Sequence, residues 1–141
     1  MTRFLRPATV RSDQGTGYDR AGEPVVARIE NYTPGHVVVD GIEQNRDVIV
    51  LPNRVLPNWW RRDGHSLVIE DLDDVLDELP ERLIVGCGYA SQLEPDPSVV
   101  EALARRGVKV EALPTPDAVA RFEELEARNP AVVAAALHLT C

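Results

Sequence analysis

Cysteine is scarce in this sequence, and its scarcity excludes two kinds of small protein. Only Cys87 and Cys141 are present among the 141 residues. Two thiols cannot build the disulfide framework of a small secreted domain or a multi-cysteine zinc site. The histidines, His36, His65 and His138, lack the spacing of metal ligands, so no metal or other cofactor is expected. The cysteine usage predicts a protein of the reducing cytoplasm.

Long apolar runs and positive charge are also lacking. The longest uncharged apolar run covers 131–137, far short of the roughly 20 residues that span a bilayer. No apolar stretch follows Arg3 and Arg6, so the start does not read as a secretory signal. Lys and Arg number 15 against 23 Asp and Glu, which gives a formal net charge of −8. A field of this sign repels a phosphate backbone, so we expect no nucleic acid binding. The short apolar runs predict no membrane insertion.

What is present suits a single globular domain behind a flexible arm. Apolar residues make up 44% and charged residues 27%, an ordinary globular composition. Residues 12–22 are polar and glycine-rich without a hydrophobic period, which predicts an arm over 1–24 and one domain over 25–141. The arm has a net charge of +1 and the rest −9. Two interpretations stay open, a disordered tail and an arm that folds back on the acidic body.

The first half of the domain carries strand signals. β-rich runs end at turn-forming pairs, Pro34-Gly35 after the first run and Asp40-Gly41 after the second. The segment 56–60 contains a proline and suits an edge or irregular stretch. The predicted strands are 25–30, 36–39 and 47–51. They indicate an antiparallel meander.

The second half alternates helices with strands. Asp96-Pro97 is a helix start and Gly107 a helix stop, with Val99, Val100 and Leu103 predicted to face inward. The predicted helices are 70–79, 97–106 and 115–128, and the predicted strands are 82–85 and 108–113. The tail 131–139 is ambiguous by periodicity, and its valines and the break at Asn129-Pro130 favour a final strand. This order predicts an α/β fold, a mixed β-sheet flanked by helices in three layers.

Two glycines follow the buried strand 82–85. The dinucleotide fingerprint requires a third glycine three residues later, where this chain has Ser91. We interpret Gly86 and Gly88 as small residues of a sharp turn, with phosphate binding as the alternative. Cys87 between them is interpreted as an apolar filler, with a nucleophile as the alternative.

A small-anion or small-molecule site is the functional alternative that these strand ends suggest. Glu111 interrupts a predicted strand, so its carboxylate needs a partner, and Arg121 and Arg128 on the next helix are the candidates. Exposure of that face at the edge of the sheet is the plainer alternative. In a parallel sheet the glycine turn and Thr115 meet at one edge, where the last helix begins. A hydroxyl of Thr115 that merely caps the helix is the plainer interpretation. The predicted cleft residues are Gly86, Cys87, Gly88, Glu111, Thr115 and Arg121.

Trp59 and Trp60 are adjacent in an extended segment, so their side chains point to opposite faces. One indole can join the core, and the other lies at the surface, where tryptophan commonly anchors protein contacts. Packing of that indole against the arm is the alternative. We expect a protein partner, and a homo-oligomer is also open.

These motifs in their order resemble one small family over residues 25–139. The matching stretches are 37–42, 48–52, 83–88, 110–115 and 132–137. The chain is similar to the family of NADH dehydrogenase (complex I) assembly factor 3 and the adipogenesis-associated MTH-like domain protein. The resemblance implies a mixed sheet flanked by helices and a role in assembly or regulation. Where the family usually has Thr-Tyr-Asn, this chain has Arg121-Phe122-Glu123, which implies different polar chemistry at that helix.

The sequence therefore predicts a cytoplasmic, non-catalytic protein-interaction or assembly-factor-like module with an MTH-like domain. Its predicted interaction surface includes Trp59 and Trp60, and no catalytic or metal-binding residue is assigned. The binding protein with a cleft at Gly86–Gly88, or a minor enzyme built on it, is the alternative.

Overall fold

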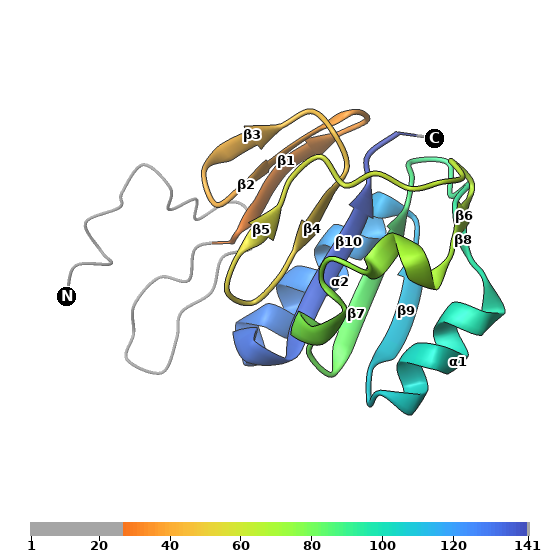
Figure 1. Ribbon diagram of the computed structural model, residues 1–141. Helices are drawn as coiled ribbons and strands as arrows, with labels where there is room; N and C mark the ends of the chain where they lie inside the picture. The colour runs from red at the N-terminus through yellow and green to blue at the C-terminus, as the bar shows by residue number, and fades with distance from the viewer. Residues whose placement is uncertain (1–26, 141) are drawn as a thin grey trace.

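A five-stranded mixed sheet in the order β5-β4-β10-β7-β9 forms the centre of the molecule (Figure 1). It is seen in a computed structural model that describes residues 27–140, so the predicted arm lies outside the described residues. The strands are β4 (Val48–Val50), β5 (Val55–Leu56), β7 (Arg82–Cys87), β9 (Lys109–Leu113) and β10 (Val133–His138). β10, β7 and β9 run parallel, whereas β4 is antiparallel to both its neighbours. The predicted α/β class with a mixed sheet is confirmed.

The central strand, β10, is buried on both faces. Its side chains alternate between two cores, with Ala134 and Ala136 facing one and Ala135 and Leu137 facing the other. A strand buried on both faces reads as a continuous apolar run, which is why 131–139 was predictable as a strand. The alanines keep the strand narrow between the layers that cover it.

One face of the sheet is covered by α1 (Pro97–Arg105) together with irregular segments and the small parallel pair β6 (Ser66–Leu67) and β8 (Glu94–Pro95). The predicted cap is present, because the Asp96 side chain accepts a hydrogen bond from the N–H of Ser98. Gly107 ends the helix with φ +83°. Val99 and Leu103 are buried as predicted, but Val100 is exposed, so its inward placement was wrong.

The predicted helix over 70–79 is instead two short 3₁₀ turns, η3 (Ile69–Leu72) and η4 (Leu76–Glu78). Its apolar stripe still packs on the sheet through Leu72 and Val75. No α-helix forms here, because the backbone N–H groups of this stretch bond to carbonyls three residues earlier instead of four. Asp71 is also held by contacts outside the stretch. The carbonyl of Asp71 accepts from the Trp59 indole and its carboxylate from the Val68 N–H.

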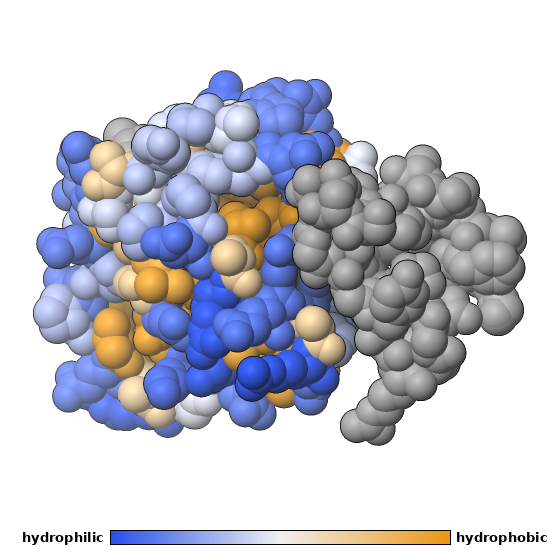
Figure 2. All heavy atoms as spheres, turned by 180° about the vertical axis from the view of Figure 1, so that it is seen from behind, coloured by the Kyte–Doolittle hydropathy of each residue, from blue (hydrophilic) through white to orange (hydrophobic). Residues whose placement is uncertain are grey.

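The other face carries α2 (Thr115–Arg128) and a three-stranded antiparallel sheet, with the 3₁₀ turn η5 (Pro130–Val132) after the helix. That sheet consists of β1 (Ile29–Thr33), β2 (His36–Val39) and β3 (Ile42–Gln44). The first strand lies later than the predicted 25–30, and its register shifts between Glu30 and Thr33. Figure 2 views the molecule from behind Figure 1, on a face that is mostly hydrophilic with apolar patches between polar side chains.

Arg28 ties the start of β1 to three other segments. Its guanidinium donates to both carboxylate oxygens of Asp40 at 2.8 Å and to the carbonyl of Leu51 at 2.8 Å. The carboxylate of Glu126 on α2 lies 3.7 Å from the same guanidinium. Burial raises the pKa of Glu126 to about 7, because Arg28 offsets only part of the lost hydration.

We expect Glu126→Gln to stabilise the protein at pH 8 and to leave its stability nearly unchanged at pH 4. In the unfolded chain this carboxyl titrates near 4.3, so the folded state holds the proton more tightly than the unfolded state does. The free energy of unfolding of the wild type therefore falls as the pH rises from about 4.3 through about 7. The gain at pH 8 should reach up to about 3 kcal/mol in urea denaturation. Glu124→Gln, at an exposed position two residues earlier, should give no gain. A wild-type stability that is flat from pH 5 to 8 would contradict the prediction.

Candidate functional site at the carboxyl ends of the parallel strands

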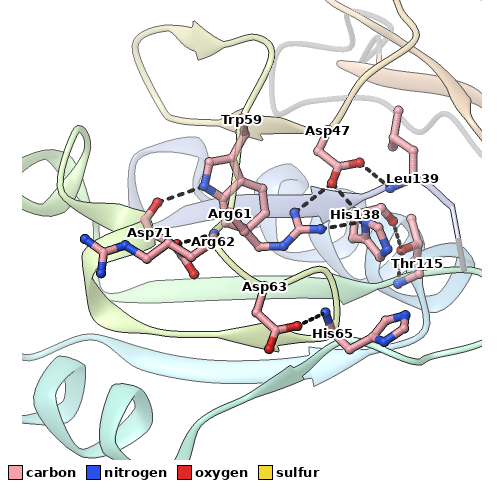
Figure 3. Close-up of polar contacts among 11 residues, drawn as sticks. Asp47, Trp59, Arg61, Arg62, Asp63, His65, Asp71, Thr115, His138 and Leu139 are labelled. Atoms are coloured by element: carbon pink, nitrogen blue, oxygen red, sulfur yellow. Dashed lines mark hydrogen bonds and ion pairs between the residues drawn. The ribbon is translucent and has the colours of Figure 1, made fainter.

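The Asp47 carboxylate gathers three segments at the edge where β7 and β10 end. The segment between β5 and β6 crosses this edge in Figure 1 and carries Arg61. Arg61 Nη1 donates to Asp47 Oδ2 at 2.7 Å, and the N–H of Leu139 donates to Oδ1 at 2.8 Å (Figure 3). The carbonyl of Asp47 accepts from the N–H of Trp59 at 2.8 Å. One residue thus holds the crossing segment against the end of β10.

His138, the last residue of β10, completes the cluster. Its Nδ1 lies 2.8 Å from Asp47 Oδ2 and 2.9 Å from Arg61 Nη2. A single ring nitrogen donates in one tautomer and accepts in the other, so only one of these contacts is a hydrogen bond at a time. The Nε2 of His138 and the Nε of Arg61 are buried and have no protein partner among the described residues.

The surroundings hold Asp47 in its ionised form. Burial alone would raise the pKa of Asp47, but hydrogen bonds from His138, Leu139 and Arg61 outweigh burial, and the pKa lies below its ordinary value. Arg61 also lies over the Trp59 ring, with 4.8 Å between the guanidinium carbon and the ring centroid. The charges are therefore compensated within the cluster.

We expect Asp47→Asn to destabilise the protein by about 3 kcal/mol at pH 7, since it leaves the buried Arg61 without a carboxylate. Urea denaturation followed by tryptophan fluorescence measures this loss. Because the pKa of Asp47 is lowered in the folded state, its ionised carboxylate stabilises the wild type only while it remains charged. The difference in free energy of unfolding between the variant and the wild type should therefore narrow as the pH falls below about 4. Asp73→Asn, at an exposed carboxylate, is the matched control and should change little. A loss below about 1 kcal/mol would show that the cluster does not hold this edge together.

Thr115 fills the crevice that was predicted between the glycine turn and the last helix. Its hydroxyl donates to the carbonyl of His138 at 2.6 Å and accepts from the N–H of Gly88 at 2.8 Å. The predicted helix cap is wrong, because Thr115 is the first residue of α2 and Pro114 occupies the cap position. Gly88 has φ +100°, as expected of a sharp turn. The turn, the helix start and β10 are thereby joined directly.

Gly86 permits this close approach. A Cβ at position 86 would meet Thr115 Oγ1 at 2.9 Å and a methyl carbon of Leu137 at 3.0 Å. Both neighbours are themselves completely buried, so neither can move away freely.

We expect Gly86→Ala to destabilise the protein by about 1–3 kcal/mol through this overpacking. The control is Gly64→Ala, where a Cβ would meet nothing within 4 Å and where the change should stay within about 0.5 kcal/mol. Thermal or urea unfolding of the two variants compares them directly. Equal stability of the two variants would mean that Thr115 and Leu137 adjust at little cost.

The other predicted cleft residues do not converge on one pocket. Arg121 contacts Glu111 at 3.2 Å, as placed from the sequence, but it also pairs with Glu124 at 2.7 Å. These partners occupy its guanidinium on the outer side of β9 and α2. Cys87 is buried, and burial raises the pKa of its thiol, which keeps it protonated at neutral pH.

The two tryptophans separate as adjacent side chains of an extended segment should. Trp59 is buried, and its indole N–H donates to the carbonyl of Asp71 at 2.8 Å. Trp60 is 75% exposed. A second aromatic side chain, Tyr89, is exposed in the turn after β7, and its N–H donates to the carbonyl of Thr140 at 3.3 Å. The same edge of the sheet therefore presents two exposed aromatic rings.

Sequence reasoning missed the cluster of Asp47, Arg61 and His138. Asp47 and His138 were placed at strand ends without a role, and Arg61 was not singled out. A usable signal did exist for two of them, since Asp47 and His138 are polar residues at the ends of apolar strands. The antiparallel pairing of β4 with β10, in which Val48 faces Leu137, brings these two ends together.

Two general features of the described residues bear on function. No group of three or more His, Cys, Asp or Glu side chains within 27–140 is arranged to hold a metal ion. Over the same part of the chain, every helix is too short or too polar to cross a membrane.

Solved structures with the same fold come from several prokaryotes. The conserved hypothetical protein PH1505 of Pyrococcus horikoshii is 28% identical, with a TM-score of 0.66 over 80% of this chain and 98% of that chain. A protein of Bartonella henselae described as an outer membrane protein is 24% identical, with a TM-score of 0.69 over 82% and 96%. A Bordetella pertussis protein described as a Mth938-like domain is 21% identical, with a TM-score of 0.62 over 80% and 85%.

The fold of this chain is therefore that of the Mth938-like domain, in agreement with the MTH-like resemblance inferred from its sequence motifs. The sequence pattern of one family matches residues 29–138, which include every strand of the central sheet and both α-helices. That family is described as a protein of unknown function (DUF498/DUF598), and this chain belongs to it.

Proposed function

We propose that this chain is a non-catalytic protein-interaction module of the assembly-factor kind. It would contact its partner through the edge at the carboxyl ends of β7 and β10. The observation that carries the proposal is the position of Trp60, which is 75% exposed between two buried neighbours. Trp59 and Arg61 are both fixed by hydrogen bonds at 2.7–2.8 Å. The exposed indole therefore stands on a backbone that is held on both sides.

A fixed aromatic side chain suits a binding anchor. Tryptophan and tyrosine dominate the residues that carry binding energy in protein interfaces. Burying an exposed indole against a partner gains the hydrophobic free energy of a large ring. Because the segment around Trp60 is already ordered, association would lose little conformational entropy there.

The backbone beside both exposed rings supports a shaped surface. Asn58, two residues before Trp60, has φ +55°, and Ser91, two residues after Tyr89, has φ +58°. Left-handed backbone at non-glycine residues is uncommon and tends to occur where function requires a particular loop shape. Exposed aromatic residues next to small polar ones are also typical of protein-binding loops.

The chemistry of this edge supports binding rather than catalysis. The Cys87 thiol has a raised pKa and is buried, which is the opposite of an activated nucleophile. Few N–H groups remain free at the start of α2 to bind an anion at the alternative site. Its Thr115 and Ala118 N–H groups already donate to protein carbonyls, and Pro116 has none. The scarcity of cysteine supports a cytoplasmic location for such a module.

We expect Trp60→Ser to abolish capture of the partner while leaving the fold intact. Immobilised wild-type protein and the variant are exposed to the same host extract, and bound proteins are quantified by mass spectrometry. A protein retained by wild type should fall at least tenfold on the variant, the effect of losing about 1.4 kcal/mol at an interface anchor. Titration of the purified partner then measures the two affinities.

Ile42→Ser is the matched control. Ile42 is 64% exposed, similar to Trp60, but it lies on β3 beside the β2–β3 turn, away from the carboxyl edge. This variant should retain the partner at the wild-type level. Loss of the partner from both variants, or from neither, would contradict the proposed surface. Unchanged melting temperatures for both variants establish that any loss of binding is local.

A further inference from the structure

A groove opens at the opposite edge of the central sheet, where β7 and β10 begin. Its volume is about 350 Å³, and half of its lining residues are prolines, with a single carboxylate beside them. The lining residues are Pro52, Asn53, Glu78, Pro80, Pro130 and Ala131. They come from the turn after β4, the end of η4 and the start of η5. The three proline rings offer rigid apolar surface to the side chains of an extended peptide.

The described part of the chain begins beside this groove. Arg28 donates to the carbonyl of Leu51, the residue immediately before the groove residue Pro52. β1 then runs away from this edge, because Gly35 at its far end donates to the carbonyl of Leu139 beyond the end of β10. The 26 residues that precede Ala27 therefore join the described structure at the groove's edge of the sheet.

Charge around the groove favours a basic occupant. The described residues carry a net charge of −9, and seven acidic residues fall within 70–81, among them the groove residue Glu78. Arg54 pairs with Glu78 and Arg106 with Asp77, so only part of this charge is compensated locally. Asp73 and Asp74 are exposed in the same stretch.

The first eleven residues have the matching chemistry. They contain three arginines and no acidic residue, together with Phe4, Leu5 and Val10. We infer that residues 2–11 of this chain dock in the groove, with apolar side chains against the prolines and arginines towards the acidic stretch. The inference does not depend on the proposed function, because it concerns the opposite edge of the sheet.

The connection is long enough for this contact. Sixteen residues separate Arg11 from Arg28, a span that reaches up to roughly 55 Å when extended. A tethered segment meets its site at an effective concentration of the order of millimolar, so a contact that would be weak between separate molecules is populated. Attraction between arginines and surface carboxylates is screened by salt, which gives the contact a second signature.

Amide spectra of the full-length protein test the inference. We expect the double variant Phe4→Ser, Leu5→Ser to shift the amide signals of Asn53, Glu78 and Ala131, which line the groove. The signals of Trp60 and Tyr89 at the other edge should stay in place. Arg3→Ser combined with Arg6→Ser should shift the same groove signals, and about 0.5 M salt should do so in wild type. Arg20→Ser, in the same part of the chain but outside the docking stretch, is the control and should leave them unchanged.

A spin label gives an independent measurement that does not rely on loss of contact. Leu5→Cys in a Cys141→Ser background places one reactive thiol near the start of the full chain, because Cys87 is buried. The label should broaden Asn53 and Ala131 more than Trp60 and Tyr89. Broadening centred on the carboxyl edge, uniform weak broadening, or groove signals that ignore all the variants would overturn the inference.

Discussion

The half-buried carboxylate of Asp47 is the contact on which the carboxyl edge of this fold depends. It joins the start of β4, the segment that crosses the sheet and the end of β10, through partners 14 and 91 residues away. Hydrophobic packing could hold the sheet layers together without it. The course of the crossing segment, however, follows from where Arg61 and Trp59 find their hydrogen bonds. The carbonyl of Asp47 fixes one of them and its carboxylate the other.

The same edge shows how polar groups at the carboxyl ends of parallel strands can be satisfied within the protein. In such sheets the space beyond the carboxyl ends of the strands is where small molecules usually lodge. Here the absence of a side chain at Gly86 lets Thr115 approach, and its hydroxyl bridges the N–H of Gly88 to the carbonyl of His138. These polar groups bind one another. What remains available at this edge is its outer surface, with two aromatic rings.

Sequence reasoning succeeded where the cause of a structure is local. The cap of Asp96, the helix stop at Gly107 and the strand β10 are each determined within a few residues, and each was predicted. It failed where the cause is distant. The stretch 70–79 has a helical period, but contacts of Asp71 with Trp59 and with Arg62, 12 and 9 residues away, draw it into 3₁₀ turns. The cluster of Asp47, Arg61 and His138 spans most of the chain, and no local pattern could assemble it.

A buried ion cluster adds little net stability, because replacing it with well-packed apolar side chains often leaves the free energy of unfolding unchanged or raises it. Its particular contribution is geometry. Apolar contacts would allow the crossing segment several positions, whereas the bonds of Arg61 and Trp59 allow one. Trp60 lies between those two residues, so the backbone that carries its exposed ring is set before any partner arrives. The proposed binding role would use that arrangement, because an anchor on a fixed backbone loses little conformational entropy on association.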